Sequence, residues 1–311
     1  MHLESTPAGL SIHVETSTQP GLRLESSRSR RLRLVAGGES VFWARIENGY
    51  YGVFALRRED KPAVVRAIRA DEARAGRDID GWMRWFALEL LASEVSPLGP
   101  GHWHLTELVP KPSSMWSDLF VPQHDDGLAG PAFDLMSSLE RPSITYEDWG
   151  SNGSAGVMPL RQRSPSDAGR VKSWIKHARD ETLPPILLWW VGALDAHLIL
   201  DGHDRLAAAL ETGVTPRVMT LWQSIDEPVD VDPKAQAHFI ENYMQLFDNP
   251  NVELMARRRL NAKLIAKHRD ACRRRVTHAK ANPVLDDSWD SEVRAVAPAG
   301  SDDLEDMLRD D

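Results

Sequence analysis

The sequence predicts an α+β protein with two domains, and three observations lead to this fold class. Hydrophobic residues make up 42% of the 311 residues, which is enough for packed cores in a chain longer than one ordinary domain. Short apolar runs bounded by Gly, Pro and Asn alternate with stretches in which apolar residues recur every three to four positions. Both patterns occur in each half of the chain, so we expect strands and helices in both halves.

Composition narrows the class of protein further. The single cysteine, Cys272, excludes an intramolecular disulfide and any metal or redox motif that needs two cysteines. The start of the chain has no basic segment followed by an apolar one, and no run of about 18 apolar residues occurs. We therefore expect no membrane span and a cytoplasmic location. A net charge of −9 argues against general affinity for nucleic acids but leaves local basic patches open.

The first half divides into two parts. Residues 1–20 are rich in Ser, Thr and Pro and are expected to form a flexible lead-in. Residues 21–150 are expected to form an N-terminal α+β domain of unknown role. Two apolar runs flank Asn48-Gly49 in this domain, a pattern typical of a β-hairpin.

Helical patterns follow the expected hairpin. Residues 62–74 and 82–95 have helical apolar spacing, and in the second stretch Trp82, Trp85 and Phe86 share one face. From residue 96 to 156 the density of Pro, Gly, Ser and Asp rises. This composition predicts a long connection and a domain boundary near residue 150.

A second α+β domain is expected over residues 151–228. A helix that begins near Ser164 and ends before Pro184 is followed by two apolar strands, a second helix and a third strand. Gly213 lies where a left-handed residue would end the second helix. The second strand and second helix meet in the run Leu200-Asp-Gly-His-Asp-Arg205.

The break between that strand and helix carries the candidate site. A helix start presents unpaired N–H groups and the positive end of the peptide dipoles, which together favour a phosphate. Gly202 permits a close approach of a ligand, while His203 and Arg205 add hydrogen-bond donors and charge. The alternative is a plain turn in which Asp201 caps the helix and Arg205 pairs with a neighbouring carboxylate.

In this order and spacing the elements resemble the ParB/sulfiredoxin fold, over about residues 155–225. The resemblance rests on Val157-Met-Pro-Leu160, the helix over 170–179, Leu183-Pro-Pro-Ile-Leu187 and the loop from Leu200 to Ala208. In that family the loop binds the phosphates of a nucleotide. The resemblance therefore implies that Gly202, His203 and Arg205 bind the ligand.

The chain departs from the family's pattern at several positions. His203 stands where sulfiredoxins have a reactive cysteine, so a thiol mechanism lacks its nucleophile. No helix-turn-helix pattern of the ParB type follows Trp222, and no carboxylate precedes Asp167 in the opening segment, where free serine kinases of this fold have their base. Asp204 replaces the second histidine of the loop and adds negative charge there. It can hold Mg²⁺ or orient His203, and the alternative is that no phosphate binds at this loop.

These residues predict a nucleotide- or phosphate-binding protein whose ligand is a nucleoside triphosphate with Mg²⁺. If it is an enzyme, it is expected to be a nucleotide-dependent phosphotransferase or nucleotide hydrolase with His203, Asp201 and Asp204 as catalytic residues. In that mechanism Arg205 neutralises developing charge, His203 moves a proton, and Asp201 or Asp204 holds the ion.

Two histidine clusters offer alternative metal sites. His197, Asp201 and His203 carry donors that suit a transition metal, although His203 lies beyond the turn. His102 and His104 point to one side of an extended chain, but the sequence identifies no third ligand near them.

The C-terminal region combines two segments of opposite charge. Residues 229–281 are expected to form a basic helical extension, in which residues 252–281 carry a net charge of +8. Residues 282–311 carry −8 and are expected to be a disordered acidic tail. We hypothesise that the tail masks the basic helix, and the alternative is a solvated basic helix that the tail does not contact. The alternative function is therefore a non-enzymatic module that binds DNA or an acidic protein through residues 252–281.

Overall fold

The computed structural model describes residues 2–6, 9–15, 19–47, 52–59, 63–108, 139–140, 144–148, 156–225, 241 and 274–309. This part of the chain contains two β-sheets and six α-helices, so the protein is of mixed α+β class. The chain forms two compact units, Met1–Gln223 with Thr277–Asp311, and Ser224–Val276. Residues on both sides of the expected boundary near 150 therefore belong to one unit, which is described below.

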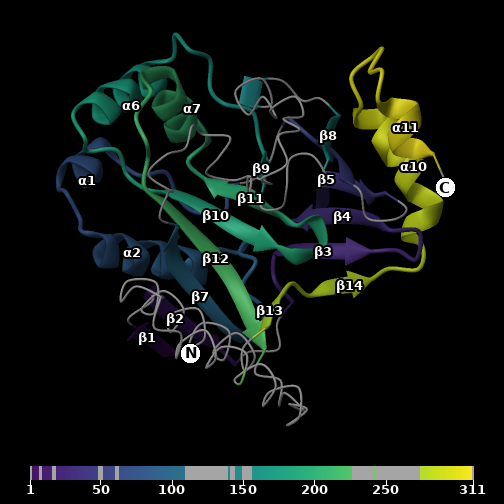
Figure 1. The fold of residues 1–311 in the computed structure, drawn as a ribbon, viewed down its shortest axis with the longest axis horizontal. Helices are drawn as coiled ribbons and strands as arrows, with labels where there is room; N and C mark the ends of the chain where they lie inside the picture. The colour runs from purple at the N-terminus through teal and green to yellow at the C-terminus, as the bar shows by residue number, and fades with distance from the viewer. Residues whose placement is uncertain are drawn as a thin grey trace. The chain divides into compact units, whose positions relative to one another are not determined.

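The first sheet combines strands from both halves of the sequence (Figure 1). Its order is β1 (His2–Thr6), β2 (Gly9–Val14), β7 (Gly101–Leu108), β12 (Val218–Ile225), β10 (Ile186–Val191), β11 (Ala196–Asp201) and β9 (Gly156–Pro159). β10 pairs antiparallel with β11 and parallel with β12, and β11 pairs parallel with β9. The helices α6 (Gly169–Arg179) and α7 (His203–Thr212) connect these strands, as parallel neighbours require. The helix, strand, strand, helix, strand order predicted for the second half is confirmed.

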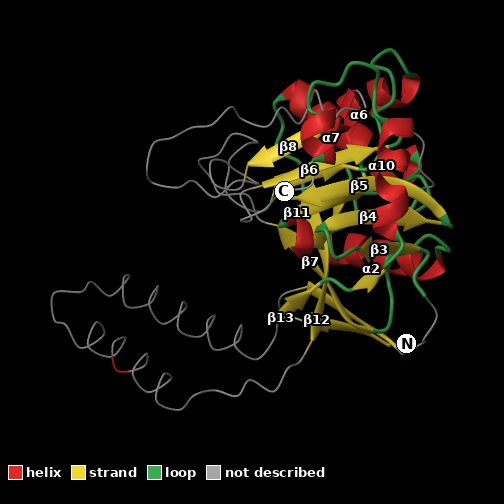
Figure 2. Cartoon of the chain, turned by 90° about the vertical axis from the view of Figure 1, so that its right-hand side faces the viewer, coloured by secondary structure: helices red, strands yellow, loops and turns green. Residues whose placement is uncertain are grey.

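The second sheet has the order β14 (Ala279–Ala281), β3 (Leu22–Ser26), β4 (Arg31–Ala36), β5 (Glu39–Ile46), β6 (Gly52–Arg57) and β8 (Thr145–Asp148). Figure 2 shows β4, β5 and β6 side by side. β5 and β6 pair antiparallel with Ile46 opposite Val53, which confirms the predicted hairpin. Both sheets contribute to one hydrophobic core, which includes Ile12, Leu24, Leu34, Leu105 and Leu198.

Helix α2 (Ile79–Ala92) packs on β2 and β7. It begins where the Asp78 side chain accepts a hydrogen bond from the Gly81 amide, and it buries Trp82, Trp85, Phe86 and Leu90. This helix was predicted, but only Ala70–Arg74 (α1) of the helix expected over 62–74 is helical. Val64, Val65 and Ile68 are all buried. These residues are buried without forming a helix, so tertiary packing overrides the apparent helical spacing there.

The expected flexible lead-in over residues 1–20 is wrong for its described part. Residues 2–6 and 9–14 are the strands β1 and β2, and β2 pairs antiparallel with β7. Leu10, Ile12 and Val14 alternate into the core, as a strand with one buried face requires. The Ser- and Thr-rich composition concealed this period of two.

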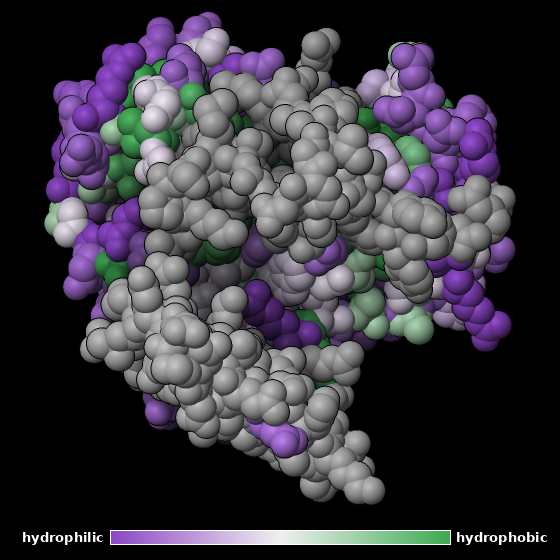
Figure 3. All heavy atoms as spheres, viewed as in Figure 1, coloured by the Kyte–Doolittle hydropathy of each residue, from purple (hydrophilic) through white to green (hydrophobic). Residues whose placement is uncertain are grey.

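The expectation of a disordered acidic tail is also wrong for its described part, residues 282–309. Residues Leu285–Val296 form α10 and Leu304–Leu308 form α11, which lie against the second sheet (Figure 1). The stripe Leu285, Trp289 and Val293 is buried against Trp43, Phe54 and Leu56. Hydrophilic residues predominate on the surface over these helices (Figure 3). An amphipathic face therefore orders this segment despite its ten carboxylates.

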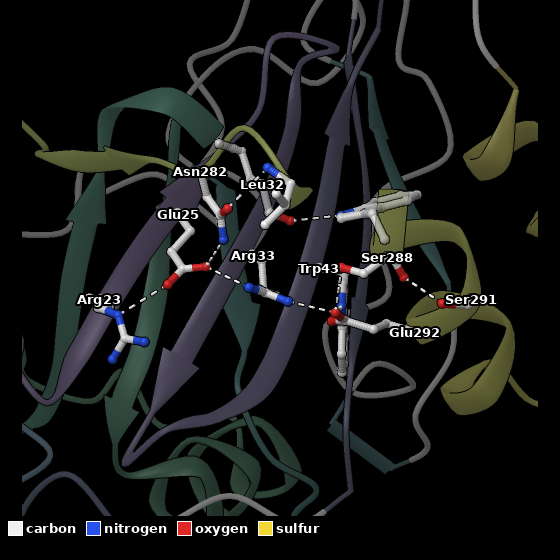
Figure 4. Close-up of polar contacts among 11 residues, drawn as sticks. Arg23, Glu25, Leu32, Arg33, Trp43, Asn282, Ser288, Ser291 and Glu292 are labelled. Atoms are coloured by element: carbon white, nitrogen blue, oxygen red, sulfur yellow. Dashed lines mark hydrogen bonds and ion pairs between the residues drawn. The ribbon is translucent and has the colours of Figure 1, made fainter. Parts of the chain in front are cut away.

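The acidic helices also pair with arginines of the sheet (Figure 4). Arg33 on β4 lies 2.6 Å from Glu25 and 2.5 Å from Glu292, and Trp43 donates to Glu292 at 2.9 Å. Burial opposes ionisation of Glu25, but hydrogen bonds from Arg33 and Asn282 outweigh it and lower its pKa. The sheet residues that make these hydrogen bonds and ion pairs lie on β3, β4 and β5.

The expected basic helix lies mostly outside the described residues. Its end is not helical, because residues 274–276 form the strand β13 and residues 279–281 form β14. The hypothesis that the tail masks residues 252–273 concerns residues that the structure does not describe. Within the described ranges, no helix is both long and apolar enough to cross a membrane.

Glu147 on β8 is a buried carboxyl group at the junction of the two sheets. Its carboxyl group packs over the backbone of Gly156 on β9, and its Oε2 atom has no hydrogen-bond partner among the described residues. Burial and, secondarily, the negative charge of Asp195 raise the pKa of Glu147 to about 7. The folded protein therefore favours the protonated form.

Replacing Trp289 by Ala should remove much of the contact between α10 and the second sheet. We expect a loss of about 3–5 kcal/mol in the free energy of unfolding, as for other buried tryptophans, measured by chemical denaturation. Val284→Ala is the control, because Val284 is 63% exposed and should cost less than about 0.5 kcal/mol. Equal effects of the two substitutions would contradict the docking of α10.

Glu147 should make stability depend on pH. Its contribution is present below the ordinary value of 4.5 and is lost as the pH rises through the folded value of about 7. Glu147→Gln should therefore stabilise the protein at pH 8, by on the order of 3 kcal/mol, and change little near pH 4. The free energy of unfolding, measured between pH 4 and pH 8, tests this prediction. Glu211→Gln is the control, because Glu211 is exposed. Parallel pH profiles for wild type and Glu147→Gln would refute the assignment.

Candidate functional site

The break between β11 and α7 has the local structure that the sequence predicts. β11 ends at Asp201, and Gly202 has φ +105°. α7 runs from His203 to Thr212, and Gly213, which follows it, has φ +67°. A Cβ on Gly202 would lie 3.0 Å from Arg205 Nη2 and 3.3 Å from Ile186. Both the backbone conformation and the space around it therefore require glycine at position 202.

His203 is fully buried and accepts hydrogen bonds from two backbone amides. Its Nε2 atom lies 3.1 Å from the Leu160 nitrogen and 3.2 Å from the Arg161 nitrogen. An imidazole nitrogen that accepts N–H groups carries no proton, so the neutral ring has its proton on Nδ1. His203 thus joins the segment after β9 to the start of α7.

Asp204 binds the same segment and is only 2% exposed. Its Oδ1 atom accepts from the Ser164 amide at 2.7 Å, and Oδ2 accepts from the Ser164 hydroxyl at 3.0 Å. Arg161 Nη2 and Arg170 Nε each lie 3.5 Å from Oδ2. Four donors around one carboxylate compensate for its burial. The start of α7 therefore already has an anion, which the chain itself supplies.

Arg205 is buried and turns toward β10. Its Nη2 atom donates to Asp201 Oδ2 at 2.6 Å and to the Pro185 carbonyl at 2.9 Å, and its guanidinium lies over Trp174. The pairing matches the alternative in which Arg205 binds a neighbouring carboxylate. The Asp201 side chain does not cap the helix.

The predicted ligand-binding and catalytic side chains are thus brought together, but the protein itself engages them. His203 and Asp204 hold the segment after β9, and Asp201 and Arg205 hold each other. Internal hydrogen bonding satisfies polar groups that would otherwise be costly to bury. The structure assigns these four residues positions inside the fold rather than on an open surface.

Two arginines that the sequence analysis did not select lie at the outer edge of this cluster. Arg161 is 29% exposed and Arg170 is 44% exposed, and both approach Asp204. Arg170 lies in the first turn of α6, whose N-terminus has no side-chain cap among the described residues. The signal in the sequence was the basic segment Arg161-Gln-Arg163 directly after the Pro-Leu opening.

Hydrogen-bond donors exceed acceptors around α6 and α7. Arg205 Nε and Trp174 Nε1 are buried, and neither has an acceptor within the part of the chain that the structure describes. Arg163 Nη1 is in the same condition. Buried donors without a protein acceptor are commonly satisfied by ordered water.

The metal sites considered from sequence are not assembled. Across the described ranges, no group of three or more His, Cys, Asp or Glu side chains is arranged to hold a metal ion. His197 packs edge-on against Trp190 at 4.9 Å, and His104 stacks on Trp222 at 4.2 Å. His197, Asp201 and His203 therefore do not form the expected cluster.

No family model matches the chain, and no curated protein or solved structure is significantly similar to it. Its function has to be inferred from the chemistry of the site, because a fold hosts many functions.

The two positive-φ glycines that bound α7 make a matched pair. Gly202→Ala should destabilise the protein more than Gly213→Ala, because a Cβ at Gly213 meets no atom within 4 Å. Backbone strain of roughly 1–2 kcal/mol applies to both, and the contacts of Gly202 add to it. Urea denaturation of both variants measures the difference. Equal losses would show that the close packing around Gly202 carries no free energy.

Proposed function

We propose that this chain binds a phosphorylated small molecule, with a nucleotide as the expected class, through Arg161 and Arg170. The observation that carries the proposal is the convergence of both guanidinium groups on Asp204 Oδ2, each at 3.5 Å. They come from different elements, one after β9 and one from α6. Planar guanidinium groups offer several donors in a fixed geometry and bind phosphate well.

Asp204 orients these arginines. It is buried and fixed by Ser164, so it holds Nη2 of Arg161 and Nε of Arg170 inward. Arg161 Nη1 donates to the Gln162 carbonyl at 2.9 Å, so Arg161 Nε and the two terminal nitrogens of Arg170 remain for an external anion. Such preorganisation lowers the entropy that binding costs.

Helix α6 adds a second favourable feature. Its first backbone N–H groups lie beside Arg170, and none of the described side chains caps them. The positive end of the helix dipole stabilises an anion there by roughly 0.3–1 kcal/mol. The arginines and the helix therefore favour the same kind of ligand.

The resemblance to the ParB/sulfiredoxin fold supports this choice of ligand, because it implies phosphate binding near the loop from Asp201 to Arg205. The proposed position differs in detail. The phosphate lies beside Asp204 on Arg161 and Arg170, and Gly202, His203 and Arg205 support the site from within the fold.

Binding is favoured over catalysis. His203 and Asp204 are buried and hold backbone groups, and Asp201 is paired with Arg205. A general base must reach the proton that it removes. The phosphotransferase and hydrolase hypotheses would require these contacts to open. The alternative DNA- or protein-binding function rests on residues 252–281, which lie mostly outside the described residues.

Thermal unfolding with pyrophosphate and a panel of nucleoside triphosphates, with and without Mg²⁺, tests the proposal. A ligand at a hundred times its dissociation constant should stabilise the folded state by about 2.7 kcal/mol. We expect the shift to disappear in Arg170→Ala and in Arg161→Ala. It should persist in Arg179→Ala, which removes an exposed positive charge from the other end of α6.

Two results would contradict the proposal. One is the lack of a shift with every member of the panel for the wild type. The other is an equal loss of the shift in Arg179→Ala, which would indicate a general effect of charge rather than a site. Circular dichroism of each variant shows whether the fold is retained.

A further inference from the structure

Three histidines form a row across the first three strands of the first sheet. His2 on β1 lies opposite His13 on β2, and His13 lies opposite His102 on β7. Directly opposed residues of antiparallel strands point to the same face. Ile12 and Trp103, the strand neighbours of His13 and His102, are buried in the core. The histidines therefore lie on the face that points away from it.

Two members of the row are in direct contact. The ring centroids of His13 and His102 are 4.3 Å apart, and the rings are tilted by 34°. His102 is exposed and the side chain of His13 is 38% exposed, so an ion from solvent can reach the pair. Opposed positions on paired strands hold such side chains at a spacing that the backbone fixes.

One nitrogen of this pair is shielded and lacks a partner. His13 Nδ1 is buried and has no hydrogen-bond partner among the described residues, while Nε2 of the same ring lies 3.9 Å from Glu15. His104 lies on the same face but already contacts Ser11 at 3.4 Å and stacks on Trp222. His13 and His102 are therefore the two members of this face whose ring nitrogens can coordinate an external ion.

We propose that His13 and His102 together bind a divalent transition-metal ion of the zinc, copper and nickel group. Neutral imidazole is a common ligand for these metals, whereas Mg²⁺ and Ca²⁺ prefer oxygen ligands. A small change of side-chain rotamer directs one nitrogen of each ring to a shared ion, because the strand register already places the rings together. Glu15 provides a nearby negative charge that favours a cation.

The geometry also limits the kind of site. Two protein ligands leave further coordination positions to water, which differs from the four ligands of a closed structural zinc site. The bound ion is therefore exchangeable and accessible to small ligands. This site lies on β2 and β7 and shares no residue with the proposed phosphate site. A failed test of one proposal therefore leaves the other unaffected.

Calorimetric titration of the full chain with ZnCl₂, without an affinity tag and after treatment with a chelator, tests the inference. We expect one binding event that His13→Asn or His102→Asn weakens at least about tenfold. His278→Asn is the control, because His278 is exposed and outside the row. MgCl₂ should give no binding heat.

Electron paramagnetic resonance with Cu²⁺ provides an independent readout. The wild type should show hyperfine coupling to two imidazole nitrogens, and either single variant should lose one. Zinc affinity unchanged in His13→Asn and His102→Asn would overturn the proposal, as would no zinc binding by the wild type at millimolar concentration. Equal weakening by His278→Asn would also count against it.

Discussion

The contact between the start of α7 and the segment after β9 positions His203, Asp204 and the two arginines of the candidate site. His203 accepts two amides of that segment, and Asp204 accepts two groups of Ser164. Losing such partners would leave buried polar groups unsatisfied, at roughly 1–3 kcal/mol each. The location of Arg161 and the approach of Arg170 to the same carboxylate follow from this contact. The candidate site thus depends on the hydrogen bonds that His203 and Asp204 make at the N-terminus of α7.

Arginines paired with carboxylates organise a second, distant part of the molecule. Arg33 lies between Glu25 of its own sheet and Glu292 of α10, and Arg31 lies 3.1 Å from Asp290. These pairs surround a hydrophobic contact centred on Trp289. Apolar burial supplies most of the stabilisation, because Glu292 and Asp290 are 24% and 46% exposed and ion pairs at such positions contribute little. The distribution of charge along the sequence shows that arginines and carboxylates can pair, but it does not show which residues form the pairs.

Local structure could be predicted from the sequence much better than long-range partners. The strand break, the left-handed Gly202 and the end of α7 at Gly213 follow from short-range rules that need no tertiary information. The pairing of Asp204 with Ser164, 40 residues earlier, has no such signal. The same limit explains the acidic tail. Leu285, Trp289 and Val293 form a visible stripe, but the sheet face that receives it is more than 200 residues away in sequence.

The candidate site also shows why a helix start with nearby arginines does not by itself identify a ligand. An internal carboxylate and an external phosphate offer the same charge type to the same donors. At α7 the internal carboxylate takes the inner position, since Asp204 is buried while Arg161 and Arg170 are 29% and 44% exposed. One carboxylate neutralises one of the two guanidinium charges. The remaining positive charge faces solvent at the uncapped end of α6, so the electrostatic preference for an anion persists after the inner position is filled.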